Sequence, residues 1–65
     1  MTKEEAQEAA QKGKKITHRF FSIEEYVTMK DDKFLDENNY VLDWDDFWAI
    51  RNSKRWETDW EIYKL

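Results

Sequence analysis

The feature that most constrains this chain is the absence of cysteine from a sequence of only 65 residues. A chain of this length buries roughly 60% of the surface that its unfolded form exposes, so its core is marginal unless something reinforces it. Disulfides and cysteine-ligated zinc are excluded, which leaves large side chains and self-association. The chain holds four Trp, three Tyr and four Phe. We therefore expect a single aromatic-rich domain over residues 1–65 that forms a homo-oligomer.

A first helix over residues 2–12 is specified at both ends. Thr2 and Glu5 have the spacing of a capping box, in which each residue satisfies the backbone amide of the other. Gly13, the only glycine, stands where a helix C-cap takes a left-handed residue. Between these ends, three alanines with helical spacing form a narrow apolar stripe that predicts close packing against another element.

In most of the following chain, successive side chains alternate between two faces with the two-residue period of a strand. Residues 15–21 place Ile16, His18 and Phe20 on one face and polar or aromatic residues on the other. The remaining predicted strands are residues 25–30 and 33–35, joined by a hairpin tip at Asp31-Asp32, a brief extended segment at 40–42, and a last strand at 60–64.

A second helix is expected to begin at Asp43. Its carboxylate can cap the amide of Asp46, and Asp45 and Asp46 place negative charge at the positive end of the helix dipole. The sequence thus predicts a small α+β fold. It has a mainly antiparallel sheet of three to four strands, an N-terminal helix, and a second helix before the last strand.

Charge is divided unevenly along the chain. The net charge is +2 over residues 1–20, −7 over residues 21–50 and +1 over residues 51–65. This pattern argues against a general nucleic-acid binder, which would present a coherent basic surface, but it permits a local basic pocket for a small anion. The charged N-terminus and the lack of a long apolar segment predict no membrane span, no signal peptide and a cytoplasmic location.

Catalytic chemistry finds little support in the sequence. His18, the only histidine, shares an apolar face with Ile16, so we interpret it as a hydrogen-bonded core residue. The acidic residues around it lack metal-ligand spacing, and a single glycine excludes a Walker-type phosphate loop. Ser22 and Ser53 lack the context of a nucleophile elbow. We expect a binding protein that is not an enzyme and needs no cofactor or metal.

Two basic segments could hold a nucleotide, which needs a stacking surface for its base and cations for its phosphates. Three cations precede Trp56, and three more lie on the outer side of the first strand. Helix-end charge and solubility are the ordinary explanation of the same residues. On the binding interpretation, the predicted ligand residues are Arg19, Tyr26, Arg51, Arg55 and Trp56.

Both ends of the chain resemble a known family. The motifs are Glu5-Ala6-x-x-Ala9-Ala10-x-x-Gly13-Lys14-Lys15-Ile16 and Trp56-x-x-Asp59-Trp60-Glu61-Ile62-Tyr63. They resemble the small phage proteins of the Thoeris anti-defence family, members of which have also been reported among type II anti-CRISPR proteins. The resemblance implies an oligomer that captures cyclic ADP-ribose-type signals. The acidic segment from Tyr40 to Ser53 departs from the glycine-rich centre of that family, so we transfer no binding residue from it.

Two functions follow as hypotheses. The first is a phage counter-defence protein that sequesters a small nucleotide immune signal without turnover. The second is a protein-binding inhibitor of a host nuclease or CRISPR effector, which would use the acidic aromatic segment 31–48 to cover a basic groove. The partner-binding residues of this alternative would be Trp44, Asp45, Asp46 and Trp48. A structural phage module whose charges only keep it soluble remains the third interpretation.

Overall fold

The computed structural model describes residues 1–64 and confirms both predicted ends of the first helix. Helix α1 spans Lys3–Gln11 with Thr2 as its N-cap. The Glu5 N–H donates to Thr2 Oγ1 over 3.1 Å and the Thr2 N–H donates to Glu5 Oε1 over 2.8 Å, which completes the capping box. Gly13 follows with φ +85°, the left-handed conformation that ends the helix and redirects the chain into the sheet.

The sheet confirms the α+β class and is antiparallel throughout the described chain. It has five strands in the order β4-β3-β2-β1-β5, where three to four were predicted. The additional strand arises because the short segment before the second helix pairs with the edge of β3. The strands are β1 (Ile16–His18), β2 (Val27–Lys30), β3 (Lys33–Asp36), β4 (Val41–Leu42) and β5 (Trp60–Ile62).

The second helix also begins as predicted. Helix α2 spans Trp44–Ala49, and the Asp43 side chain accepts the Asp46 N–H over 2.9 Å. After α2 the chain makes a short 3-10 helix, η1 (Lys54–Trp56), which the sequence pattern did not predict. This turn directs Trp56 back toward the sheet before β5 begins.

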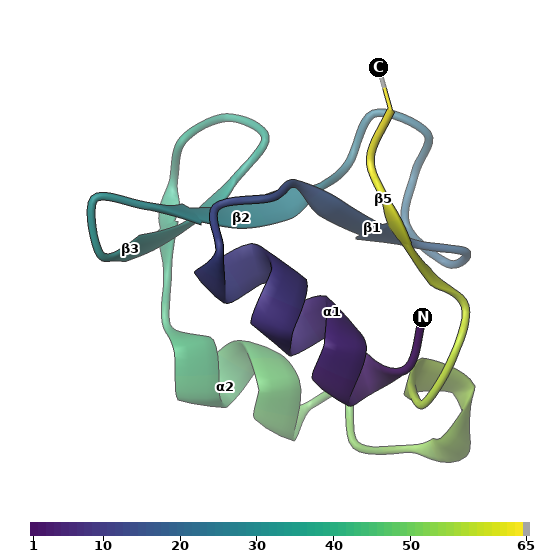
Figure 1. The fold of residues 1–65 in the computed structure, drawn as a ribbon. Coiled ribbons are helices and arrows are strands. Elements are labelled where there is room, and N and C mark those ends of the chain that lie inside the picture. Colours follow the sequence, from purple (N-terminus) through teal and green to yellow (C-terminus); the bar gives the residue numbers. More distant parts are fainter. Residues whose placement is uncertain (65) are drawn as a thin grey trace.

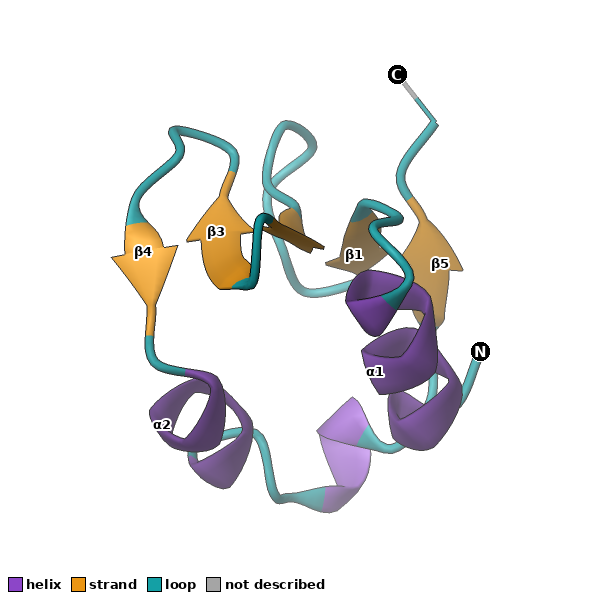
Figure 2. Ribbon diagram, turned by 60° about the vertical axis from the view of Figure 1, so that its left-hand side comes forward, coloured by secondary structure: helices purple, strands orange, loops and turns teal. Residues whose placement is uncertain are grey.

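Both helices lie on the same face of the sheet, as the two ribbon views show (Figures 1 and 2). Ile16 and Trp60 are fully buried between this face and α1, while Trp48 of α2 packs beside Phe34 with ring centroids 6.4 Å apart. The alanine stripe of α1 lets the helix backbone approach strands β1, β2 and β5. Aromatic rings thus fill most of the space between the two layers, as a short chain without disulfides requires.

The first strand is shorter than predicted, and this changes the position of Phe20. Strand β1 ends at His18, and the Phe21 N–H donates to the His18 carbonyl over 2.9 Å, so residues 19–21 form a turn. Because a turn breaks the two-residue alternation, Phe20 does not share the inner face with His18 and is 51% exposed. Phe21 packs against the core instead.

No helix among residues 1–64 is long and apolar enough to span a membrane.

Candidate functional site

His18 joins two segments that are remote in the sequence. Its ring is 3% exposed and both nitrogens are engaged: Nε2 lies 2.8 Å from the Thr58 carbonyl, and Nδ1 accepts the Phe20 N–H over 3.0 Å. Since Nδ1 accepts, the proton is assigned to Nε2, which donates to Thr58. The prediction of a hydrogen-bonded core histidine is confirmed. The ring also fixes the turn that carries Phe20 beside Arg55 and Trp56 of η1.

Two guanidinium groups flank the exposed ring of Phe20. The Cζ atom of Arg55 lies 4.7 Å from the ring centroid and that of Arg19 lies 5.9 Å from it, both within the range of cation–π attraction. The ring of Trp56 stands edge-on to Phe20 with centroids 6.0 Å apart. We call Arg19, Phe20, Arg55 and Trp56 the basic–aromatic surface. It combines a flat apolar face with two planar donors suited to phosphate or carboxylate.

Arg51, a third predicted cation, is partly buried in the aromatic cluster next to this surface. Its Cζ atom lies 3.8 Å from the Phe47 ring centroid and 5.1 Å from that of Trp56, and Nη1 donates to the Phe47 carbonyl over 3.0 Å. Burial lowers the pKa of Arg51, and the negative charge of Glu25 partly offsets this effect. Its Nε atom is buried without a partner among residues 1–64. Arg51 therefore links the end of α2 to Trp56 and supports the surface from behind.

The sequence interpretation placed Phe20 in the core and named Tyr26 as a ligand residue, and the structure puts the two rings in different surroundings. Phe20 was assigned to the core because strand alternation was extended through it. The Tyr26 ring lies in a separate pair with Tyr63, centroids 4.7 Å apart, with Lys15 Nζ 4.9 Å from its centroid. Where the chain turns, alternation no longer tells which aromatic residue faces solvent. The available sequence signal for Phe20 was its position directly after Arg19, near the end of the predicted strand.

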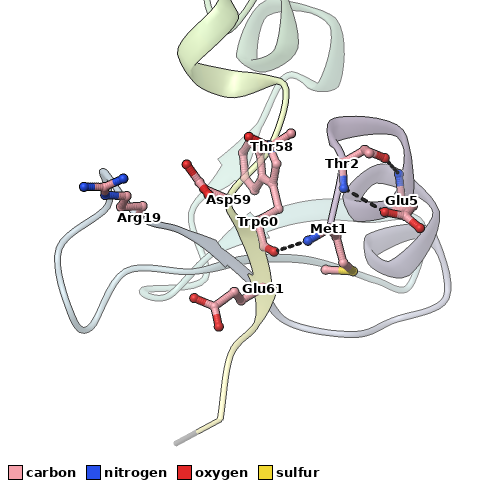
Figure 3. Close-up of a pocket in the computed structure, with 8 residues that line it drawn as sticks. All are labelled: Met1, Thr2, Glu5, Arg19, Thr58, Asp59, Trp60 and Glu61. Carbon is pink, nitrogen blue, oxygen red and sulfur yellow. Dashed lines mark hydrogen bonds between the residues drawn. The ribbon is translucent and has the colours of Figure 1, made fainter.

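A hollow of about 580 Å³ lies beside Arg19, between the start of α1 and β5 (Figure 3). The N-terminal ammonium of Met1 is occupied there, because it donates to the Trp60 carbonyl over 2.7 Å. Three carboxylates, one guanidinium and this ammonium line the hollow, so its net charge is negative and disfavours an anion. Its lining residues are Met1, Thr2, Glu5, Arg19, Thr58, Asp59, Trp60 and Glu61.

The alternative partner-binding set divides into exposed and packed residues. Asp45 and Asp46 are exposed on the first turn of α2. Trp48 is only 5% exposed, and Trp44 packs edge-on to Phe34 with ring centroids 4.9 Å apart. The indoles of this segment thus belong to the core, which requires large side chains in a chain this short. The carboxylates, but not Trp48, are available to a partner.

Comparisons with family models, curated proteins and solved structures give no match for this chain. Among residues 1–64, no three histidine or acidic side chains come close enough together to hold a metal ion.

Proposed function

We propose that this chain is a phage counter-defence protein that binds a small nucleotide signal and sequesters it without turnover. The observation that carries the proposal is the convergence of Arg19 and Arg55 on the exposed ring of Phe20. Guanidinium groups bind phosphate oxygens through paired hydrogen bonds, and an exposed ring offers a face on which a base can stack. The resemblance of the two chain ends to the Thoeris anti-defence family supports the same function.

The charge distribution favours a small ligand over a polynucleotide. The chain carries a net charge of −4, and the hollow on one side of Arg19 is lined by Glu5, Asp59 and Glu61. A long nucleic acid would extend from the two arginines over acidic surface, whereas a mononucleotide or cyclic dinucleotide fits within the reach of two guanidinium groups. We expect the phosphates to lie on the side of Arg55, away from that hollow.

The chemistry of the basic–aromatic surface supports binding rather than catalysis. Its side chains are two guanidinium groups, a phenyl ring and an indole, and none of these serves as a nucleophile or a general base at neutral pH. The nearest imidazole, His18, is buried and has both nitrogens in hydrogen bonds. A bound nucleotide would therefore be held unchanged.

We propose that the chain forms a homo-oligomer through an edge of its sheet. The outer edge of β4 is unpaired within residues 1–64. At the other end of the sheet, Met1 makes hydrogen bonds to the outer edge of β5 at Trp60. Ile62, also on β5, is 36% exposed. Unpaired strand edges favour pairing between copies of a chain.

Native mass spectrometry of the full chain, alone and with a panel of cyclic nucleotides and ADP-ribose derivatives, tests this proposal. It reports the number of copies and the mass of any retained ligand. The double variant Arg19→Gln/Arg55→Gln should weaken binding at least tenfold, because one hydrogen bond to a charged group contributes about 1.5–3 kcal/mol. Phe20→Ser should weaken it as well, since a stacked base contributes about 1–3 kcal/mol.

Matched controls separate local chemistry from net charge. Lys12→Gln/Lys33→Gln removes the same charge from exposed positions outside the surface, and Ile23→Ser removes a 90% exposed side chain elsewhere. Neither control should change the affinity by more than about twofold. Retention of no nucleotide by the wild-type chain would refute the function. Equal losses in the arginine and lysine variants would refute the assignment of the surface.

A further inference from the structure

A second depression lies between α2 and the ends of strands β2, β3 and β4, and has a volume of about 490 Å³. Figure 2 shows α2 and β4 at this side of the molecule. We call this depression the acidic groove. Its lining residues are Glu25, Val27, Asp36, Glu37, Val41, Leu42, Asp43, Asp46, Phe47, Ile50 and Arg51.

The groove is strongly acidic for its size. Five carboxylates and one guanidinium give its lining a net charge of −4, equal to that of the whole chain. Three of these carboxylates also bind backbone amides of their own loops or caps: Glu25 that of Ser22, Asp36 those of Asn38 and Tyr40, and Asp43 that of Asp46. Glu37 and Asp46 have no such role among the hydrogen bonds described. Local hydrogen bonds therefore account for three of the five carboxylates; Asp46 contributes negative charge to the first turn of α2, and both Asp46 and Glu37 keep carboxylate oxygens available to a partner.

Exposed apolar side chains border the same groove. Ile50 is 76% exposed and Val41 is 66% exposed, and Tyr40 beside Val41 is 68% exposed. Apolar residues clustered on a surface and rimmed by charge are typical of protein interaction sites.

We propose that the acidic groove docks a cationic polypeptide segment of a partner protein, in which an apolar side chain lies between lysines or arginines. The apolar side chain would contact Ile50 and Val41, and the cations would face Glu37 and Asp46. Charge complementarity favours this occupant, because the same field repels nucleic acid and acidic proteins. The proposal concerns a different surface from the nucleotide site and does not depend on it.

Fluorescence anisotropy with synthetic peptides tests the proposal on the full chain. The probes are a short fluorescein-labelled peptide of alternating lysine and leucine, a lysine–serine peptide and a glutamate–leucine peptide. The lysine–leucine peptide should bind the wild-type chain at least tenfold more tightly than either of the others, because only it satisfies both the charge and the apolar contact. Equal binding of the lysine–serine peptide would overturn the proposal.

Matched variants locate the binding. Glu37→Gln/Asp46→Asn should weaken binding of the lysine–leucine peptide roughly three- to tenfold, as expected for one half-buried and one exposed charge. Asp31→Asn/Asp32→Asn removes the same charge at the hairpin tip, where positive φ angles suit asparagine. This variant should change the affinity for the peptide by less than about twofold. Equal losses in the two variants would show that net charge alone attracts the peptide and would overturn the proposal.

Two exposed isoleucines provide the apolar comparison. Ile50→Ser should weaken binding of the lysine–leucine peptide at least threefold. Ile23→Ser, at a 90% exposed position outside the groove, should leave this affinity unchanged. If sedimentation shows a wild-type dimer that Ile50→Ser dissociates, another copy of this chain covers the groove and the proposed partner is wrong. Should a groove variant fail to fold, the three peptides on the wild-type chain still decide the question.

Discussion

Replacement of His18 by leucine should destabilise the chain because it removes two hydrogen bonds that join the Phe20 turn to the Thr58 segment. The ring donates to the Thr58 carbonyl over 2.8 Å and accepts the Phe20 N–H over 3.0 Å. An unsatisfied buried group costs about 1–3 kcal/mol. Phe20 and Thr58 are themselves exposed, so water reaches part of both groups and the low end applies.

The expected cost is therefore about 1 kcal/mol for each bond and about 2 kcal/mol for His18→Leu. At roughly 0.05–0.15 kcal/mol per residue, a chain of this size has a total free energy of unfolding of about 3–10 kcal/mol. The loss corresponds to a fall in melting temperature of roughly 8–16 °C. Thermal and urea unfolding, followed by tryptophan fluorescence, measures both quantities.

Two further variants separate the two bonds. The amide oxygen of His18→Asn can replace Nδ1 and keep the bond to Phe20, whereas the amide nitrogen of His18→Gln can replace Nε2 and keep the bond to Thr58. Each variant should lower the free energy of unfolding by about half as much as His18→Leu does, or by about 1 kcal/mol. Amide hydrogen exchange at Phe20 should accelerate in the glutamine variant but not in the asparagine variant. A leucine variant within about 0.5 kcal/mol of the wild type would refute the reasoning.

Three smaller perturbations test the local structure. Asp43→Ala should cost about 1 kcal/mol in urea unfolding by removing the N-cap of α2; an equal loss in Asp45→Ala, which removes no cap, would contradict this. Gly13→Ala should lower the free energy of unfolding by about 1–2 kcal/mol, because φ is +85° at this position. A steric clash is not the cause, since the nearest atom to a new Cβ is 3.8 Å away. Gly13→Asn should cost less, because asparagine tolerates this left-handed conformation. The hydrogen bond from the Thr2 backbone to the Glu5 carboxylate lowers the pKa of Glu5 below 4.5. Because the pKa of Glu5 is lower in the folded chain than in the unfolded chain, the ionised carboxylate stabilises the fold at pH values above the unfolded-state pKa. This stabilisation is lost as the pH falls through the folded-state pKa. The stability of the wild type should therefore decline more steeply below pH 4.5 than that of Glu5→Gln, and parallel pH profiles would contradict the assignment.

The sequence determined the parts of this protein that depend on neighbouring residues. Thr2 and Glu5 specify the start of α1, and Asp43 specifies the start of α2, because a cap is made within one helical turn. Asp31 and Asp32 adopt positive φ angles and make the hairpin tip predicted for them. These local features, together with strand alternation, were sufficient for the α+β class.

Only the tertiary structure decided where the large side chains lie. Phe20 is exposed because β1 ends two residues before it, and Trp48 is buried because α2 packs against the sheet. Arg51 packs beside the basic–aromatic surface instead of forming its face, since Phe47 and Trp56 from two separate elements contact its guanidinium. A side chain's exposure depends on contacts between segments that the sequence leaves far apart. Local periodicity carries no information about those contacts, so only the folded chain brings Arg19 and Arg55 to the same ring.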